Sequence, residues 1–335
     1  MPAATSHAEP RRVGLLLALV SAFAFGSSGT VAKPLIEAGL DPLEVTWLRV
    51  AGAALLLLPL AVRHRALVLQ RPGLIAGFGV FAMAGVQGCY FAAVSRIPVG
   101  VALLIEYLGP ALVLGWVRFV QRRPVSRAAA LGVVLAVGGL ACVVEIWAGL
   151  RFDAVGLALA LGAAVCQASY FVLSEQGSRK GRAGDDRPVP HPLGVIAQGA
   201  LLATVVLTLA ARPWGMEWGL LVERVSVDGT PVRGVVLLVW MVAVATVVAY
   251  VTGVVAVRRL SPQVAGVVAC LEAVVATLVA WVVLGEYLGW VQLAGGAVVL
   301  LGAAVAQAPG RPRGGAAAEG PVRADAVDVP PSRTG

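Results

Sequence analysis

Apolar residues fill long stretches of this chain, and charged or Pro/Gly-rich breaks separate one stretch from the next. A run of about 18 or more apolar residues is long enough to cross the hydrocarbon core of a bilayer as an α-helix. The pattern predicts ten such helices, at residues 13–33, 43–62, 73–94, 98–119, 128–147, 154–174, 192–211, 234–257, 262–284 and 289–308. We therefore expect an all-α membrane protein with ten transmembrane helices.

Composition supports this class. Of the 335 residues, 59% are hydrophobic and only 13% are charged, whereas soluble domains carry about 25% charged residues. The two ends differ from the rest, because residues 1–12 and 309–335 are rich in Ala, Pro, Gly and charge and show no periodicity. Such segments cannot bury enough apolar surface to fold, so we expect two disordered tails.

The basic residues predict the orientation. With the N-terminus in the cytoplasm, 15 Lys and Arg residues fall in cytoplasmic connections and six fall outside. The six are Lys33, Arg96, Arg151, Arg212, Arg224 and Arg233. Cytoplasmic loops carry the excess of Lys and Arg, so both termini should be cytoplasmic. This bias explains the net charge of +8, and no nucleic-acid partner is predicted, because the charges lie in separate short loops.

The chain also contains an internal repeat. The segment DPLEVTWLRVAGAALLL at 41–57 resembles HPLGVIAQGALLATVVL at 191–207, and AAVSRIPVGVA at 92–102 resembles VAVRRLSPQVA at 255–265. The sequence therefore predicts two halves of five helices, at 13–147 and 154–308. Because five is odd, the second half would insert upside down, as in the inverted repeats of secondary transporters. The alternative is a chance likeness between helices rich in Ala, Val, Leu and Gly.

Two acidic residues lie deep inside predicted spans. Glu106 follows Pro98 by eight residues and Glu272 follows Pro262 by ten, which places them about 12 and 15 Å deep at 1.5 Å per residue. A lipid-facing carboxylate at this depth is costly, so both should face the bundle interior. They either line a substrate or proton path, which is the default interpretation of intramembrane acids, or serve as buried structural acids.

Arg49 and Pro110 lie near the same depth. Arg49 could pair with Glu106 and keep it ionised, which would leave Glu272 without a cation and make it the better proton carrier; alternatively, Arg49 extends toward the outer interface. Pro110 removes a backbone donor four residues after Glu106. A broken helix at the midplane often forms part of a transporter site, although membrane helices also tolerate kinks.

Further polar residues recur at helical spacing and should point inward. The candidates for the substrate or proton path are Ser28, Gln87, Tyr90, Gln167, Tyr170 and Tyr250. Hydrogen bonding between helices is the more common role of Ser, Thr and Gln in membranes. The long connection at 212–233 is predicted to lie outside, with Trp214 and Trp218 at the interface.

The sequence offers little for catalysis. It contains no GxxxxGK[ST], HExxH or GxSxG motif, so no nucleotide-hydrolysing loop, zincin helix or nucleophile elbow is predicted. With three His, four Cys and no zinc-type spacing, we expect no metal and no cofactor. An enzyme is therefore not the predicted class.

Several segments together resemble one known family. FGSSGTVAKPLIEAGLDPLEVTWLR at 25–49 and LEAVVATLVAWVVLGE at 271–286 look like the two ends of an EamA-type domain of the drug/metabolite transporter superfamily, with Gly26, Lys33 and Glu286 at expected places. ALLIEYLGPALV at 102–113 resembles the threonine/homoserine exporter branch. The resemblance covers about 13–308 and implies a multi-pass carrier of the bacterial inner membrane that exports amino acids or related metabolites.

The favoured interpretation is thus a secondary transporter, a proton-coupled exporter working by alternating access, with a small-molecule substrate, the lipid bilayer and protons as its expected partners. A passive channel or a scramblase remains an alternative, and a membrane-embedded enzyme is a weaker one. The sequence does not set the substrate, the coupling stoichiometry or the oligomeric state.

Overall fold

The computed structural model describes residues 8–122, 124, 126–144, 152–178, 190–259 and 262–306. Its elements run α1 Ala8–Glu37, α2 Pro42–Leu56, α3 Leu58–Arg63, α4 Ala66–Gln70, α5 Pro72–Gly77, η1 Phe78–Val86, α6 Gln87–Val94, α7 Val99–Glu106, α8 Gly109–Gly115, η2 Trp116–Val120, α9 Arg127–Val144, α10 Ala154–Ser178, α11 Pro192–Ala211, η4 Pro213–Gly215, η5 Trp218–Leu221, β1 Arg224–Val227, β2 Thr230–Arg233, α12 Gly234–Val239, η6 Trp240–Val248, α13 Ala249–Arg259, α14 Pro262–Leu284 and α15 Trp290–Ala306. Each expected span coincides with one helix or with a row of consecutive helices.

Among the described residues, five helices are long and apolar enough to cross a membrane: Val13–Glu37, Pro72–Val94, Val99–Val120, Pro192–Ala211 and Gly234–Ala256. Shorter apolar helices cover Ala130–Val143, Ala154–Ser169, Leu271–Leu284 and Trp290–Val305. The all-α, membrane-type architecture is thereby confirmed, whereas the count of ten crossings stays a prediction.

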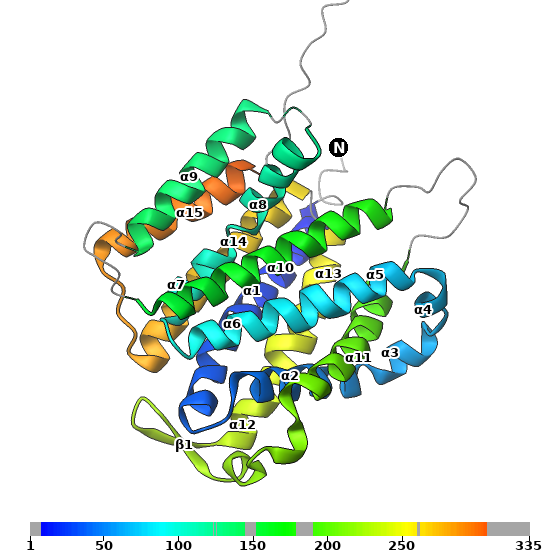
Figure 1. Ribbon diagram of the computed structural model, residues 1–335, viewed down its shortest axis with the longest axis vertical. Helices are drawn as coiled ribbons and strands as arrows, with labels where there is room; N and C mark the ends of the chain where they lie inside the picture. Colours follow the sequence, from blue (N-terminus) through cyan, green and yellow to red (C-terminus); the bar gives the residue numbers. More distant parts are fainter. Residues whose placement is uncertain are drawn as a thin grey trace, which may run out of the picture.

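The helices lie along a common diagonal, so that their ends collect at two opposite edges of the molecule (Figure 1). The edge at the lower left holds the start of α7 and the β1–β2 hairpin, and α4 lies at the right-hand edge. The connections that the charge pattern predicts as outer and as cytoplasmic are therefore separated in space. We call the lower-left edge the outer end, following that prediction.

The packing of the helices is similar in the two parts of the chain. The first helix, α1, packs against α13, η6 and α14, and α10 packs against α6, η1, α7 and α8. In the predicted halves these are equivalent partners, namely the third and fourth helices of the opposite half. The helices α2 and α11 also pack together, as do α9 and α15. This pattern is what two related, intertwined halves would produce.

Glycines bring α9 and α15 into backbone contact. A Cβ on Gly139 would lie 2.6 Å from the amide nitrogen of Val299, and a Cβ on Gly302 would lie 2.5 Å from that of Ala136. Helices in membranes commonly associate through such small residues, because the backbones can then approach closely. These glycines thus explain why α9 and α15 form a pair.

Two boundaries differ from the sequence prediction. The first helix begins at Ala8, inside the segment 1–12 that the composition predicts as a disordered tail, because a proline in the first turn and two arginines are compatible with helix. The segment 212–233, expected to be a loop, contains an antiparallel hairpin in which Val227 pairs with Thr230. Asp228 and Gly229 both have positive φ, as a two-residue hairpin turn requires.

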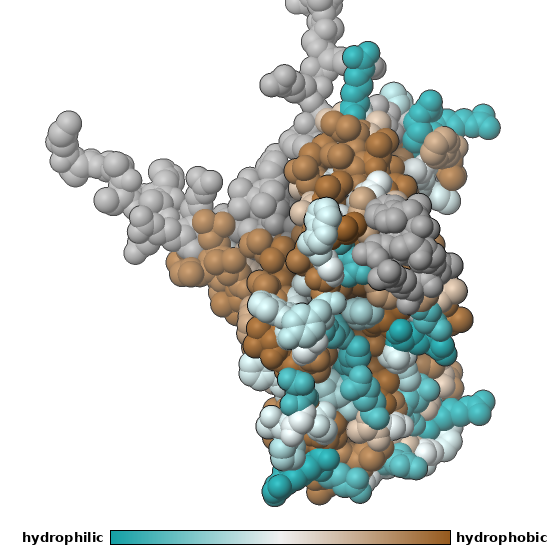
Figure 2. All heavy atoms as spheres, turned by 90° about the vertical axis from the view of Figure 1, so that its left-hand side faces the viewer, coloured by the Kyte–Doolittle hydropathy of each residue, from teal (hydrophilic) through white to brown (hydrophobic). Residues whose placement is uncertain are grey.

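The surface is largely apolar along the helices. Leu55, Val134, Leu209 and Val282 are each at least two-thirds exposed, although burial of such residues is favourable in water. Viewed from the left of Figure 1, hydrophobic residues cover the upper part of the face and hydrophilic residues collect toward its lower end (Figure 2). An apolar surface with a polar end is suited to a lipid environment.

Candidate functional site

The helix that carries Glu106 is interrupted just before Pro110. Helix α7 ends at Glu106, and α8 begins at Gly109 with Pro110 as its second residue. The amide of Tyr107 still donates to the carbonyl of Leu103 at 3.0 Å. Pro110 has no N–H, so it cannot donate to the carbonyl of Glu106 four residues earlier. The break therefore occurs directly beside the acidic side chain.

Glu106 is buried, with 8% of its surface exposed. Its Oε1 accepts a hydrogen bond from Nε2 of Gln167, on α10, at 3.2 Å. The amide of Gln167 also lies against Gly109, where an added Cβ would collide with its Oε1. Two residues predicted separately from the sequence, Glu106 and Gln167, are thus in direct contact, and Gly109 makes room for that contact.

Glu272, on α14, is partly buried. Its Oε2 accepts a long hydrogen bond from the hydroxyl of Tyr107 at 3.5 Å. On α1, a Cβ at Gly26 would lie 2.8 Å from the carbonyl oxygen of Glu272, so α1 and α14 are closely packed at this level. Each acid therefore contacts a residue of the opposite predicted half, since Glu106 bonds with Gln167 and Glu272 with Tyr107.

Arg49 does not behave as expected. It is only 1% exposed, so it does not extend to the outer interface. Nε donates to Oγ1 of Thr246 at 2.7 Å, Nη1 to Oε1 of Gln87 at 2.7 Å, and Nη2 to the carbonyl of Ala245 at 3.0 Å. The guanidinium also lies 5.4 Å from the ring centroid of Phe91. The expected Arg49–Glu106 pair is replaced by these bonds, because depth in a helix does not fix the direction of the side chain.

The remaining candidates are distributed around this core. Gln87 bonds with Arg49, and Tyr90 and Ser28 are buried. The hydroxyl of Tyr250 contacts the sulfur of Met83 at 3.4 Å, and its ring packs edge-on against Phe25. The side chain of Tyr170 is outside those that the structure describes. Gln87 and Gln167 are thus placed in contact with charged candidates, namely Arg49 and Glu106.

The sequence did not single out Tyr107, although it directly follows Glu106. It also did not assign an ion pair to Lys33 and Glu286, which the structure joins at 2.5 Å between Nζ and Oε1. The other oxygen of Glu286 accepts from the backbone amide of Val99, at the start of α7, at 2.9 Å. The spacing of these residues along the chain, more than 250 positions, leaves no local signal for the pair.

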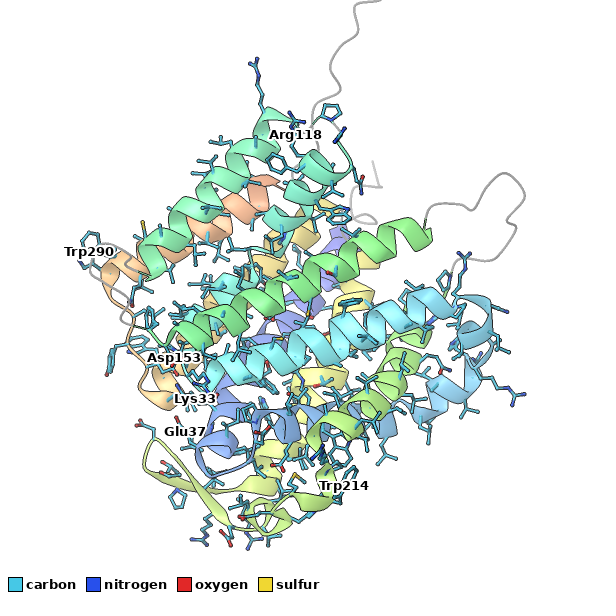
Figure 3. All side chains as sticks on the ribbon, viewed as in Figure 1. Lys33, Glu37, Arg118, Asp153, Trp214 and Trp290 are labelled. Carbon is cyan, nitrogen blue, oxygen red and sulfur yellow. The ribbon has the colours of Figure 1, made fainter. Side chains whose placement is uncertain are left out.

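A second ion pair lies near the first. Nη1 of Arg96 is 3.6 Å from Oδ2 of Asp153, whose Oδ1 accepts from the amide of Gly156 in the first turn of α10. Lys33, Glu37 and Asp153 cluster at the outer end, whereas Arg118 lies at the opposite edge (Figure 3). Both ion pairs found among the described residues are therefore at the outer end.

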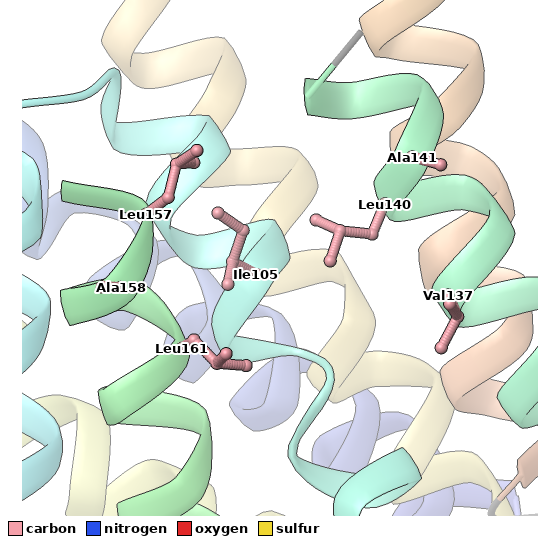
Figure 4. A pocket seen from close by; sticks show the side chains of 7 residues that line it. All are labelled: Ile105, Val137, Leu140, Ala141, Leu157, Ala158 and Leu161. Atoms are coloured by element: carbon pink, nitrogen blue, oxygen red, sulfur yellow. The ribbon is translucent and has the colours of Figure 1, made fainter. Parts of the chain in front are cut away.

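Two hollows border the helices that carry Glu106 and Gln167. One, with a volume of about 390 Å³, lies between α7, α9 and α10 and is lined by Ile105, Val137, Leu140, Ala141, Leu157, Ala158 and Leu161 (Figure 4). The other, of about 560 Å³, lies between η1, α8, η2 and α10 and is lined by Phe81, Leu112, Trp116, Val165, Ala168, Ser169 and Val172. Ala168, which lines the second hollow, directly follows Gln167 along α10.

With this geometry in view, comparison with known proteins identifies the family. The model of the EamA-like transporter family matches residues 12–145 and again 154–307. The chain belongs to the EamA-like transporter family. The chain is thus a multi-pass membrane protein of a transporter family, and the two matches agree with the internal repeat read from the sequence.

Individual relatives match most of the chain. The threonine/homoserine exporter RhtA of Salmonella typhimurium LT2 is 26% identical over 298 residues, and that of Escherichia coli K12 is 28% identical over 301. Each comparison covers 88% of this chain and 90% of the relative. A solved structure, described only as the crystal structure of a protein, superposes with a TM-score of 0.53 at 21% identity and covers 89% of this chain and 96% of its own. It supports the fold alone.

Proposed function

We propose that this chain is a secondary transporter of the bacterial inner membrane that exports amino acids or related small metabolites in exchange for protons. The observation that carries the proposal is the placement of Glu106 and Glu272. Both acids contact side chains of the opposite predicted half, and intramembrane carboxylates commonly mark substrate and proton paths. The exporter names of the relatives favour amino acids as cargo.

The proposed architecture is ten transmembrane helices in two inverted halves, with both termini in the cytoplasm. The reciprocal packing of α1 and α10 against the third and fourth helices of the opposite half supports it. Such halves allow alternating access, because one can rock against the other around a fixed site. The two ion pairs at the outer end would hold that end closed while the cytoplasmic end is open.

Glu272 is the proposed proton carrier, because its only hydrogen bond from a described residue is long and weak. A group that must release its proton in each cycle should not be held by a strong partner. Glu106, which bonds with Gln167, is assigned to substrate contact. Ser28, Gln87, Tyr90, Pro110, Tyr170 and Tyr250 are proposed to line or shape the path.

Transport in proteoliposomes tests the proposal. Purified protein should accumulate labelled threonine when a proton gradient is imposed, and should exchange it when none is imposed. In Glu272→Gln, the rate of gradient-driven uptake should fall about tenfold, which corresponds to about 1.4 kcal/mol in activation free energy. Exchange of threonine for threonine should persist. Uptake that neither saturates nor responds to the gradient would indicate a channel, and lipid flipping without threonine movement would indicate a scramblase.

A further inference from the structure

Among the described residues, Arg49 is the cation near the two acids, and it already donates hydrogen bonds within the protein. All three of its nitrogens donate to protein acceptors, namely Thr246, Gln87 and the carbonyl of Ala245. One face of the guanidinium is covered by the ring of Phe91 at 5.4 Å, and the side chain is 1% exposed. A substrate carboxylate could reach it only after these contacts were broken.

The other cations of the described chain are also engaged or distant. Lys33 is bonded to Glu286, and Arg96 to Asp153, both at the outer end. Within the described residues, Arg49 is the cation whose field reaches Glu106. Because no ready cation is presented, a carboxylate entering beside two glutamates would meet repulsion rather than a partner.

The two acids, in contrast, accept few hydrogen bonds from the part of the chain that the structure describes. An ionised carboxylate can accept about four hydrogen bonds on its two oxygens. Described residues give Glu106 one bond, at 3.2 Å, and Glu272 one, at 3.5 Å. Both of these donors are neutral side chains, an amide and a phenol. A buried carboxylate with free acceptor positions is stabilised by a ligand that brings several donors and a positive charge.

We propose that this site selects its substrate by a protonated primary amine, which Glu106 receives, and that a substrate carboxylate is dispensable. The inference rests on the proposed transport function and narrows its substrate class. An ammonium group supplies three donors, and described residues give Glu106 a single hydrogen bond. The hollow of about 560 Å³ beside Gln167 is lined mostly by apolar groups such as Leu112 and Trp116, and it receives the uncharged part of the molecule.

The proposal separates two kinds of amino-acid analogue. Threoninol keeps the amine of threonine and replaces the carboxylate with an alcohol, whereas N-acetylthreonine keeps the carboxylate and loses the cation. Binding of each is measured as thermal stabilisation of the purified full chain in nanodiscs, a readout that needs no transport. Threonine and threoninol should stabilise the protein with affinities within about tenfold of each other, and N-acetylthreonine should give no stabilisation at the same concentrations.

Variants assign the effect to residues. Glu106→Gln should weaken threonine and threoninol alike, by about tenfold or more, because both lose the same ionic partner. Gln87→Asn is the matched control, because it weakens a hydrogen bond that holds Arg49 in place. If Arg49 received the substrate carboxylate, this variant would change the affinity for threonine and leave the affinity for threoninol unchanged. We expect equal effects on the two ligands. The comparison of ligands on the unaltered chain stands even where a variant fails to fold.

The outcomes distinguish this inference from the transport proposal. Stabilisation by N-acetylthreonine without stabilisation by threoninol would overturn amine recognition, even if threonine is transported. Failure of all three compounds to stabilise the protein would overturn it as well. Amine-dependent stabilisation together with an absence of threonine transport would support the site chemistry and overturn only the proposed transport function.

Discussion

At the scale of single residues, Arg49 makes more hydrogen bonds with described residues than either acid does. It donates three hydrogen bonds and lies against an aromatic ring, and a hydrogen bond to a charged group contributes about 1.5–3 kcal/mol. Glu106 and Glu272 have one bond each from described residues. We therefore interpret Arg49 as the rigid support of the site and the acids as the groups that change partners.

Gly109 provides a test of the Glu106–Gln167 contact. A Cβ at this position would collide with Oε1 of Gln167, so Gly109→Ala should displace the amide from Glu106. A hydrogen bond to a charged group contributes about 1.5–3 kcal/mol, so we expect kcat/KM for threonine transport in proteoliposomes to fall about tenfold or more.

Gly115→Ala is the matched control, because nothing lies within 4 Å of the Cβ it would add on the same helix. That variant should retain the parent rate. Adding Gly109→Ala to Gln167→Ala should cause little further loss, since the two substitutions remove the same contact. Equal rates for Gly109→Ala and the parent would show that the contact is not required.

The residue scale also shows what sequence alone could provide. Glu106 and Glu272 could be selected because ionisable side chains inside apolar spans are costly and therefore informative. The partners of Arg49 could not be predicted, because residues at equal depth on two helices can face in different directions. Tyr107 was missed because an aromatic residue in a span gives no polar signal until the structure places its hydroxyl near Glu272.

At the scale of elements, the helices could be predicted because each apolar stretch has the length that a bilayer requires. The hairpin at 224–233 could not, since its strands are four residues each and depend on packing, with Val225 buried beneath the surface. The packing of α6 against α10 could not be predicted from the sequence either. It brings together Cys89 and Cys166, whose thiols interact directly.

The α6–α10 contact is reciprocal. The sulfur of Cys166 lies 2.9 Å from the position of a Cβ on Gly85, and that of Cys89 lies 3.5 Å from a Cβ on Gly162. Gly85 lies in η1, directly before α6, and precedes Cys89 by four residues, and Gly162 likewise precedes Cys166 by four residues in α10. This exchange is possible when the helices run antiparallel, because each cysteine is then level with the glycine of its neighbour. It agrees with the predicted orientation of the third and sixth helices.

A dithiol reagent can test this arrangement. Phenylarsine oxide condenses with two neighbouring thiols and releases water, so it should bridge Cys89 and Cys166 and join α6 to α10. We expect threonine transport to fall about tenfold or more, because relative movement of the two helices is blocked, and a monothiol such as 2-mercaptoethanol should reverse the block less well than a dithiol.

Cys166→Ser should be insensitive to the reagent, and Cys142→Ser, whose cysteine lies on α9, should be as sensitive as the parent. Mass spectrometry should find one phenylarsenic group on each inhibited chain. Inhibition that persists in Cys166→Ser would contradict the thiol pair as the target.

At the scale of the whole molecule, two ion pairs lie at the outer end, and a cavity extends toward the opposite end. Glu286 joins Lys33 of α1 and the first amide of α7, and Asp153 joins Arg96 to the start of α10. Each pair links the two predicted halves. The hollow of about 560 Å³ is lined by Trp116, two residues from Arg118, which lies at the edge opposite Lys33 (Figure 3). Such an arrangement fits a state closed to the outside.

If the ion pairs at the outer end stabilise the closed state, removing one pair should open that end more often. Glu286→Gln removes the charge that Lys33 faces, and a partly exposed ion pair contributes up to about 1 kcal/mol, or about fivefold in the ratio of closed to open molecules. We place a reporter thiol by Ser28→Cys, a buried position on α1, in a background whose four native cysteines are serines. Its labelling by a membrane-impermeant maleimide from outside should become several times faster.

Glu37→Gln is the matched control, because Glu37 also lies at the outer end of α1 but is exposed and has no bonded partner among the described residues. It should label at the parent rate. An equal acceleration in both variants would attribute the effect to lost surface charge, and an unchanged rate in Glu286→Gln would remove the Lys33–Glu286 pair as a gate. Faster labelling in Glu286→Gln alone would assign the outer gate to Glu286, which bonds to Lys33 of α1 and accepts from the first amide of α7.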